Sequence, residues 1–262
     1  MVAGRCAMKR AFRWLGGLLG LALIFGAGWA WPVLFRPPLI VGQDAITDQA
    51  TIGVTPVIED AGGRLIRVAP PAGTAAKDVL VIIYPGGLVR PQAYEWLARM
   101  LAVRGYETLI PEFSFDLAVT DTDRASALIQ RYADGRKVVL AGHSLGGAMA
   151  AQYLADELKA GREPVAGLVL MAAYPPDGAS LASAKLKVAS LKGEFDNVAD
   201  AAKIADGLRR LPKDSKLLQI DGGVHSFFGR YGPQSGDGVP AVSRTDAERE
   251  IVNAIVSFLG RL

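Results

Sequence analysis

Segments of two periodicities alternate along most of this chain, and this alternation limits its possible folds more than any other feature. Runs typical of β-strands are separated by stretches with the apolar spacing of helices. The strand-like runs are residues 52–57, 64–69, 79–84, 107–112, 137–141, 167–172, 187–192 and 216–221. The helix-like stretches are residues 91–105, 121–133, 144–160, 196–211 and 244–262.

The middle strands of this series are apolar at successive positions, as in VLVIIY at 79–84 and GLVLMA at 167–172. Such runs place apolar side chains on both faces of a sheet, which is typical of parallel strands covered by helices on either side. The sequence therefore predicts one α/β domain over residues 51–262, with a mostly parallel sheet of about eight strands and helices on both faces.

Composition excludes several classes of protein. The 262 residues include one cysteine, Cys6, so neither a disulfide within the monomer nor a cysteine-based metal cluster can form. The 29 basic and 26 acidic residues give a net charge of +3, and no basic run is interleaved with aromatic residues. We therefore expect no nucleic-acid partner. No metal or organic cofactor is implied.

The N-terminal segment differs from the rest of the chain. Residues 14–35 form an uncharged stretch of 22 residues, long enough for a helix to cross a bilayer. Four basic residues precede it, namely Arg5, Lys9, Arg10 and Arg13, and Arg36 follows it. This asymmetry predicts a basic segment and transmembrane signal anchor in residues 1–36, a linker over 37–50, and the remaining domain on the extracytoplasmic side. The alternative is secretion after signal cleavage, although Gly28-Trp29-Ala30 is a poor cleavage site.

A serine stands at an abrupt junction between strand and helix. The stretch VVLAGHSLGG at residues 138–147 runs from an apolar strand through Gly142, Ser144 and Gly146 into an alanine-rich helix. The glycines can be read as a simple turn, or as the two positions where side chains would collide with a strained serine. On the second reading Ser144 is a nucleophile, and the N–H of Leu145 at the start of the helix is a donor to an oxyanion.

A nucleophilic serine needs a base, and the chain contains two histidines. His143 is adjacent to Ser144, so its side chain projects in a different direction, and we expect it to pack or to form a hydrogen bond near the site. His225 follows the last strand-like run, where a loop can carry an imidazole back over the sheet edge. His225 is therefore the candidate base.

The base needs a carboxylate to orient it. The stretch SLKGEFDNVADA offers Glu194, Asp196 and Asp200. Asp196 follows a strand directly and is the candidate acid, with Glu194 in reserve. The structural alternative is that Asp196 caps the N-terminus of the following helix.

These motifs together resemble the α/β-hydrolase family over essentially everything from residue 50 onward. The resemblance is carried by VVLAGHSLGG, by YPGG at 84–87, by the acid in GEFDNV and by GGVHSFFGRYGPQSGDG. It is nearest to small bacterial serine hydrolases of the dienelactone-hydrolase-like group. It implies the α/β-hydrolase fold and a triad of Ser144, Asp196 and His225. It also implies a second oxyanion donor in the loop after the third strand, Gly87 or Leu88.

Ester cleavage needs only such a triad and oxyanion hole, and no gap between strands is long enough for a large lid. We therefore expect a serine hydrolase that cleaves carboxylic esters of modest acyl groups through an acyl-enzyme, with thioesters or amides as alternatives for the same residues. A rival of another class is a membrane-anchored binding module with this fold and no turnover, which fold alone does not exclude. The loop over residues 227–238 is expected either to hold His225 or to contact substrate.

Overall fold

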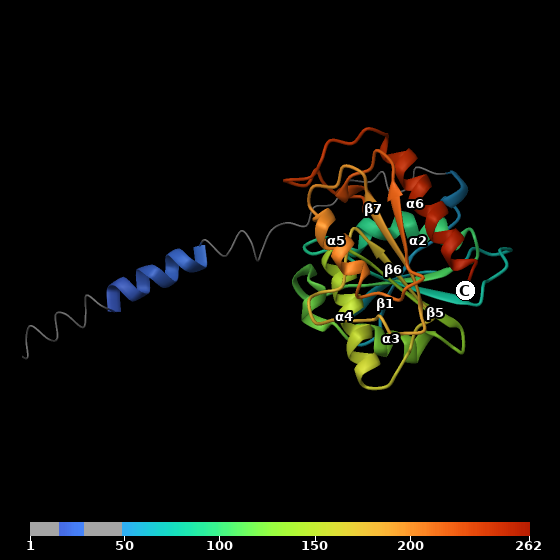
Figure 1. Cartoon of the computed structure of the whole chain (residues 1–262), viewed down its shortest axis with the longest axis horizontal. Helices are drawn as coiled ribbons and strands as arrows, with labels where there is room; N and C mark the ends of the chain where they lie inside the picture. Colours follow the sequence, from blue (N-terminus) through green and yellow to red (C-terminus); the bar gives the residue numbers. More distant parts are fainter. Residues whose placement is uncertain (1–15, 29–48) are drawn as a thin grey trace, which may run out of the picture. The chain divides into compact units, whose positions relative to one another are not determined.

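The computed structural model describes residues 16–28 and 49–262. The chain divides into two units, residues 1–37 and 38–262, and each is described by itself. In the first unit, residues 16–28 form a helix (Figure 1). In the part of the chain that the structure describes, no helix has both the length and the apolar character needed to span a membrane. The predicted span 14–35 extends at both ends beyond the described helix, into residues outside the described ranges.

The second unit is built on a sheet of eight strands in the order β1-β2-β4-β3-β5-β6-β7-β8. The β1, β2 and β4 strands pair antiparallel, and all pairs from β4 through β3 to β8 are parallel. The strands are β1 Val57–Asp60, β2 Arg64–Val68, β3 Val79–Tyr84, β4 Glu107–Pro111, β5 Lys137–His143, β6 Gly167–Met171, β7 Lys187–Gly193 and β8 Lys216–Ile220. The predicted mostly parallel sheet is confirmed.

Helices cover the two faces of this sheet (Figure 1). The α-helices are α2 Glu95–Ala102, α3 Arg124–Tyr132, α4 Leu145–Lys159, α5 Ala201–Leu208 and α6 Arg244–Leu259. The 3-10 helices are η1 Gln49–Thr51, η2 Pro91–Tyr94, η3 Ser114–Asp116, η4 Ala118–Asp121 and η5 His225–Phe228. Alternate residues of each buried strand enter opposite cores: Val81 and Ile83 pack with α2 and α6, whereas Leu80 and Ile82 pack with α3 and α4.

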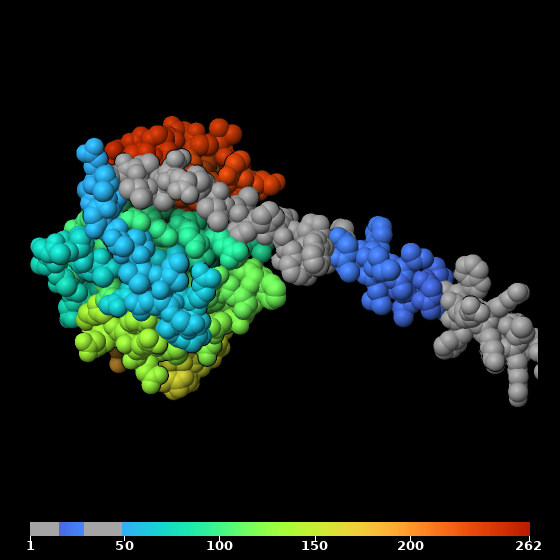
Figure 2. Space-filling model, turned by 180° about the vertical axis from the view of Figure 1, so that it is seen from behind, coloured from blue at the N-terminus to red at the C-terminus, as the bar shows by residue number. Residues whose placement is uncertain are grey.

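The first strand lies later than predicted. The sequence pattern places it at 52–57, but β1 begins at Val57, after Gly53 and Pro56, which are unfavourable in strands. The turn to β2 determines the pairing instead, because Asp60 Oδ1 accepts hydrogen bonds from the N–H groups of Gly62 and Gly63, each at 3.1 Å. The resulting hairpin, light blue in Figure 2, lies at the molecular surface.

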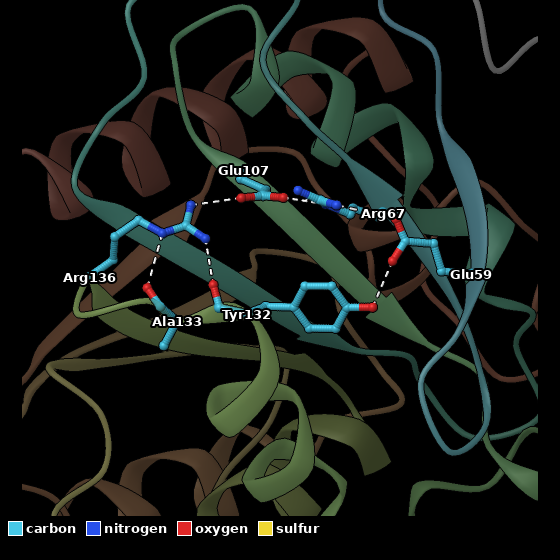
Figure 3. A network of polar contacts seen from close by, with 6 residues as sticks. All are labelled: Glu59, Arg67, Glu107, Tyr132, Ala133 and Arg136. Carbon is cyan, nitrogen blue, oxygen red and sulfur yellow. Dashed lines mark hydrogen bonds and ion pairs between the residues drawn. The ribbon is translucent and has the colours of Figure 1, made fainter.

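A network of charged side chains joins this hairpin to the rest of the sheet (Figure 3). Arg67 of β2 forms ion pairs with Glu59 of β1 and with Glu107 of β4. Glu107 also accepts from Arg136 at 2.7 Å, and Glu59 accepts from the Tyr132 hydroxyl at 2.6 Å. The network therefore connects β1, β2, β4 and the end of α3. It gives the short β1 strand side-chain contacts in addition to its backbone hydrogen bonds with β2.

Candidate active site

Ser144 occupies the turn between β5 and α4 in a strained conformation. Its φ of 51° and ψ of −123° lie in a backbone region that residues other than glycine rarely adopt. The Ser144 N–H donates to the carbonyl oxygen of Met171 on β6 at 3.0 Å, which holds the turn against the neighbouring strand. A strained residue that persists at a strand end is typical of a functional site.

The flanking glycines are required by close backbone approach. A Cβ atom at Gly142 would lie 2.6 Å from the backbone of Gly147, and one at Gly146 would lie 2.2 Å from the carbonyl oxygen of Pro85. Neither position leaves room for a side chain, and the atoms in the way are backbone atoms that cannot rotate aside. The turn from β5 to α4 at residues 142–146, called the elbow below, therefore has the tight geometry that the sequence pattern predicts.

The structure brings His225 and Asp196 together. His225 Nδ1 lies 2.9 Å from Asp196 Oδ2, and the side chains of the two residues are 1% and 2% exposed. The other oxygen, Asp196 Oδ1, accepts from the N–H groups of Val198 at 2.9 Å and Ala199 at 2.8 Å. Asp196 is thus fixed by its own turn, and its contact with Nδ1 leaves the Nε2 atom of His225 for another partner.

The two other acidic candidates are engaged elsewhere. Asp200 is the N-cap of α5, accepting from the N–H groups of Ala202 at 2.8 Å and Lys203 at 3.3 Å. Glu194 Oε2 accepts from the N–H of Gly222 at 2.8 Å. The helix predicted from residue 196 therefore begins at Ala201 instead, because Asp196 forms its own turn and Asp200 provides the cap.

The His225 ring lies at the elbow. Its centroid is 4.6 Å from that of His143, the residue that precedes Ser144 in the chain. Among the residues described, the Ser144 hydroxyl forms no hydrogen bond. The structure thus joins Asp196 to His225 and places His225 beside the elbow, whereas the contact between Ser144 and His225 stays a prediction.

The loop after β3 offers one free backbone donor beside the elbow. The N–H of Leu88 donates to the carbonyl of Asp116 at 2.8 Å, and the N–H of Gly86 donates to the Tyr94 hydroxyl at 2.8 Å. The N–H of Gly87 has no acceptor among the described residues. Of the two expected second donors, Leu88 is therefore occupied and Gly87 is available.

Gly87 lies directly against the start of α4. A Cβ atom added to Gly87 would be 3.0 Å from Leu145 Cδ2. The N–H of Leu145, at the first position of the helix, has no acceptor within α4. Two unpaired N–H groups from neighbouring backbones are the arrangement that can bind a developing negative charge.

Asp237 is a site residue whose role the sequence left open. Its carboxylate accepts from the N–H of His225 at 3.0 Å and from that of Ser226 at 2.8 Å. Arg244, at the start of α6, donates to the carbonyls of Ser226, Gly229 and Tyr231. Of the two expectations for the loop over 227–238, these contacts support holding His225. The signal was an acid in a glycine-rich loop just after the histidine.

A pocket of about 390 Å³ adjoins Ser144. Its walls are Ser144, Leu145, Ala148, Met149, Ala172, Ala173, Tyr174, Pro176, Val198 and Ala199. These residues include no charged side chain, so the pocket suits an uncharged apolar group. Among the residues described, no three His, Cys, Asp or Glu side chains are grouped so that they could hold a metal ion.

Comparison with known sequences gives one family. The profile of the family described as "Alpha/beta hydrolase family" matches residues 80–249, nearly two thirds of the chain. This range contains Ser144, Asp196 and His225. No curated protein matches the chain by sequence.

Solved structures share the fold at low sequence identity. A predicted CIB-like hydrolase from Thermoplasma acidophilum is 17% identical, with a TM-score of 0.57, covering 80% of this chain and 99% of its own. An a/b serine hydrolase without a lid from Xanthomonas campestris is 18% identical, with a TM-score of 0.55 and coverages of 79% and 95%. The esterase domain of a Rhodothermus marinus protein is 13% identical, with a TM-score of 0.55 and coverages of 79% and 98%.

Proposed function

Because the chain belongs to the alpha/beta hydrolase family, we propose that it is a serine hydrolase that cleaves carboxylic esters through an acyl-enzyme on Ser144. The predicted family is confirmed, and the narrower likeness to the dienelactone-hydrolase-like group stays a prediction. The observation that carries the proposal is the 2.9 Å contact between His225 Nδ1 and Asp196 Oδ2 beside the strained elbow.

In the first half of the reaction, Ser144 Oγ attacks the ester carbonyl carbon while its proton passes to Nε2 of His225. Asp196 keeps the proton on Nδ1 and stabilises the imidazolium that forms. The tetrahedral intermediate then collapses, the bond from carbon to the alcohol oxygen breaks, and His225 gives its proton to the departing alcohol. Water repeats the sequence on the acyl-enzyme, which releases the acid and restores the Ser144 hydroxyl.

The negative oxygen of each tetrahedral intermediate is bound by the N–H groups of Gly87 and Leu145. Of the two expected second donors, Gly87 and Leu88, we choose Gly87, because the Leu88 N–H already donates to the carbonyl of Asp116. Loss of one such donor typically costs about 10²-fold to 10³-fold in kcat. The positive end of α4 adds to this stabilisation.

The apolar pocket beside Ser144 favours esters whose group in this pocket is uncharged and of modest size. A carboxylate placed there would lose its hydration and find no cation among the ten lining residues. The similar structure from Xanthomonas campestris is a serine hydrolase without a lid, which agrees with an accessible site of this kind.

The test compares the purified full chain with its Ser144→Ala variant on p-nitrophenyl acetate, butyrate and octanoate and on mono-p-nitrophenyl succinate. We expect the parent to hydrolyse the uncharged esters faster than the succinate and to be labelled by a fluorophosphonate. The Ser144→Ala variant should neither hydrolyse these esters above the uncatalysed rate nor be labelled. Equal turnover by parent and variant would contradict the role of Ser144, and absence of labelling and turnover in the parent would favour the binding-module alternative.

For location, we propose that residues 14–35 anchor the chain in a membrane with the hydrolase domain on the extracytoplasmic side. The support is the uncharged length of that stretch and the basic residues before it. The test is extraction of the membrane fraction, first with high salt and then with detergent. Release by detergent alone is expected, whereas release by salt, or a soluble chain shortened at its N-terminus, would contradict the anchor.

A further inference from the structure

A buried tyrosine connects the loop after β3 to the histidine of the elbow. The Tyr94 hydroxyl accepts a hydrogen bond from the N–H of Gly86 at 2.8 Å and lies 2.8 Å from His143 Nδ1. Tyr94 and His143 are both fully buried. Neither was singled out for a catalytic role by the sequence, because they stand 49 residues apart and only the fold makes them neighbours.

The partners of the Tyr94 hydroxyl indicate which nitrogen of His143 carries the proton. The Gly86 N–H can only donate, so it uses an acceptor site of the Tyr94 oxygen. Among the described residues the Tyr94 hydroxyl has no other acceptor for its single proton, so we assign that proton to a hydrogen bond donated to His143 Nδ1. The neutral His143 ring therefore carries its own proton on Nε2.

The surroundings keep His143 neutral. Its ring is enclosed by those of Tyr94, His225, Phe228 and Tyr231, with centroids between 4.6 and 5.9 Å away. Burial, together with the nearby His225, holds the pKa of the His143 imidazole well below its usual value of 6.5. A neutral His143 adds no like charge beside His225 when His225 becomes positively charged.

The same pair shapes the loop that carries the candidate oxyanion donor. A Cβ atom at Gly86 would lie 2.8 Å from His143 Nδ1 and 3.0 Å from the Tyr94 oxygen. The loop is thus in close contact with both side chains, and Gly87 is the next residue. A shift of the Tyr94 hydroxyl would move Gly86 and, through one peptide bond, the N–H of Gly87.

We propose that Tyr94 and His143 are positioning residues that fix the Gly87 donor in place relative to the His225 imidazole. The hydrogen bonds from Gly86 to Tyr94 to His143, followed by the ring contact with His225, connect the two halves of the site. The catalytic part of this inference rests on the proposed hydrolase function. The hydrogen-bond chain itself does not.

Tyr94→Phe removes the central hydroxyl, and Tyr84→Phe is its matched control. Tyr84 is also fully buried, and its hydroxyl accepts from the N–H of Ala125 at 2.7 Å and donates to the carbonyl of Thr122 at 3.1 Å. Both variants leave a buried N–H unpaired, so both should lose similar stability towards urea. Only Tyr94→Phe should lower kcat, by about tenfold to hundredfold with KM nearly unchanged. Equal kcat values in the two variants would overturn the proposal.

Two substitutions of equal size at His143 separate positioning from packing. The Oδ1 atom of asparagine lies close to the position of the Nδ1 atom of histidine, so His143→Asn keeps an acceptor for Tyr94, whereas His143→Leu has none. We expect His143→Asn to retain kcat within about tenfold of the parent and His143→Leu to lose about tenfold more. A His143→Leu variant as active as His143→Asn would show that His143 only fills space.

The proton on His143 can be read without any substrate. With two histidines in the chain, ¹⁵N correlation spectra of the ring nitrogens resolve each of them. His143 should carry its proton on Nε2 and should not titrate near pH 6.5, where a free imidazole does. A proton on Nδ1, or titration near 6.5, would overturn the hydrogen-bond chain. A parent that cleaves no ester would overturn the proposed hydrolase function and the catalytic role of this pair, while the spectra still decide whether the chain of hydrogen bonds exists.

Discussion

The carboxylate of Asp237 holds the backbone of His225. Asp237 Oδ1 accepts from the N–H of His225 at 3.0 Å, and Oδ2 accepts from the N–H of the next residue, Ser226, at 2.8 Å. The candidate base is therefore fixed at two places by two different acids, its ring by Asp196 and its backbone by Asp237. The contact with Asp237 fixes the backbone position from which the His225 side chain extends. Hydrogen bonds of the imidazole ring alone do not fix that position.

Loss of the backbone contact should impair catalysis more than binding. In Asp237→Asn one of the two accepting oxygens becomes an amide group that donates, so one N–H of the η5 turn loses its partner. We expect kcat on p-nitrophenyl acetate to fall by about tenfold to hundredfold, with KM changed by less than threefold. The matched control is Asp246→Asn, an exposed acid of α6, which should keep its kcat. A similar loss in both variants would count against the role given to Asp237.

Removal of the carboxylate charge at Asp196 should have a larger effect. Asparagine in its place can present an N–H group to His225 Nδ1, which favours the wrong ring tautomer, and a loss of about 10³-fold to 10⁴-fold in kcat is expected. Asp200→Asn is the control, because Asp200 caps α5 and asparagine is as good a cap. If the two variants were equally active, the acid would have to be sought elsewhere.

The elbow should not tolerate a methyl group at its second glycine. Gly146→Ala places a Cβ atom 2.2 Å from the carbonyl oxygen of Pro85, so the β3 loop or α4 must move. We expect a loss of about 3 kcal/mol or more in the free energy of unfolding, measured in urea. Gly53→Ala, where a Cβ atom meets nothing within 4 Å, should change it by less than about 0.5 kcal/mol. A fully stable Gly146→Ala protein would contradict the close approach.

The contribution of Glu59 to stability should depend on pH. The hydrogen bond from Tyr132, and then that from Arg67, hold the pKa of Glu59 below its usual value of 4.5, although burial opposes them. A lowered folded-state pKa gives stability that is fully present above pH 4.5 and is lost as the pH falls through the folded-state value. Glu59→Gln should therefore cost stability at pH 7, and this difference should shrink towards pH 3. Tyr132→Phe should show the same trend, and a difference independent of pH would contradict it.

The sequence predicted those parts of the molecule that depend on local pattern. Seven strands lie where apolar runs predict them. A run with apolar side chains on both faces, such as those containing Ile82 and Leu168, is buried only when helices cover both faces of the sheet. The elbow could also be predicted from the sequence. Gly142 and Gly146 are needed because a Cβ atom there would collide with backbone only a few residues away or at the end of the adjacent strand.

The parts that depend on distant partners could not be read in this way. Nothing near Leu88 in the chain indicates that the carbonyl of Asp116 takes its N–H. The first strand is displaced because its register follows the turn at Asp60 rather than its own apolar residues. The position of Tyr94 against His143 likewise arises from the packing of η2 beside β5, to which no short motif corresponds.

The three carbonyl contacts of Arg244 bear on the order in which this protein matures. Ser144 and its elbow belong to β5 and α4, in the middle of the chain, whereas the segment that bears His225 is secured from Asp237 and from Arg244, which follow it. A ribosome therefore delivers the serine long before the residues that hold the imidazole. On the proposed mechanism, we expect a growing chain to remain inactive until α6 has docked.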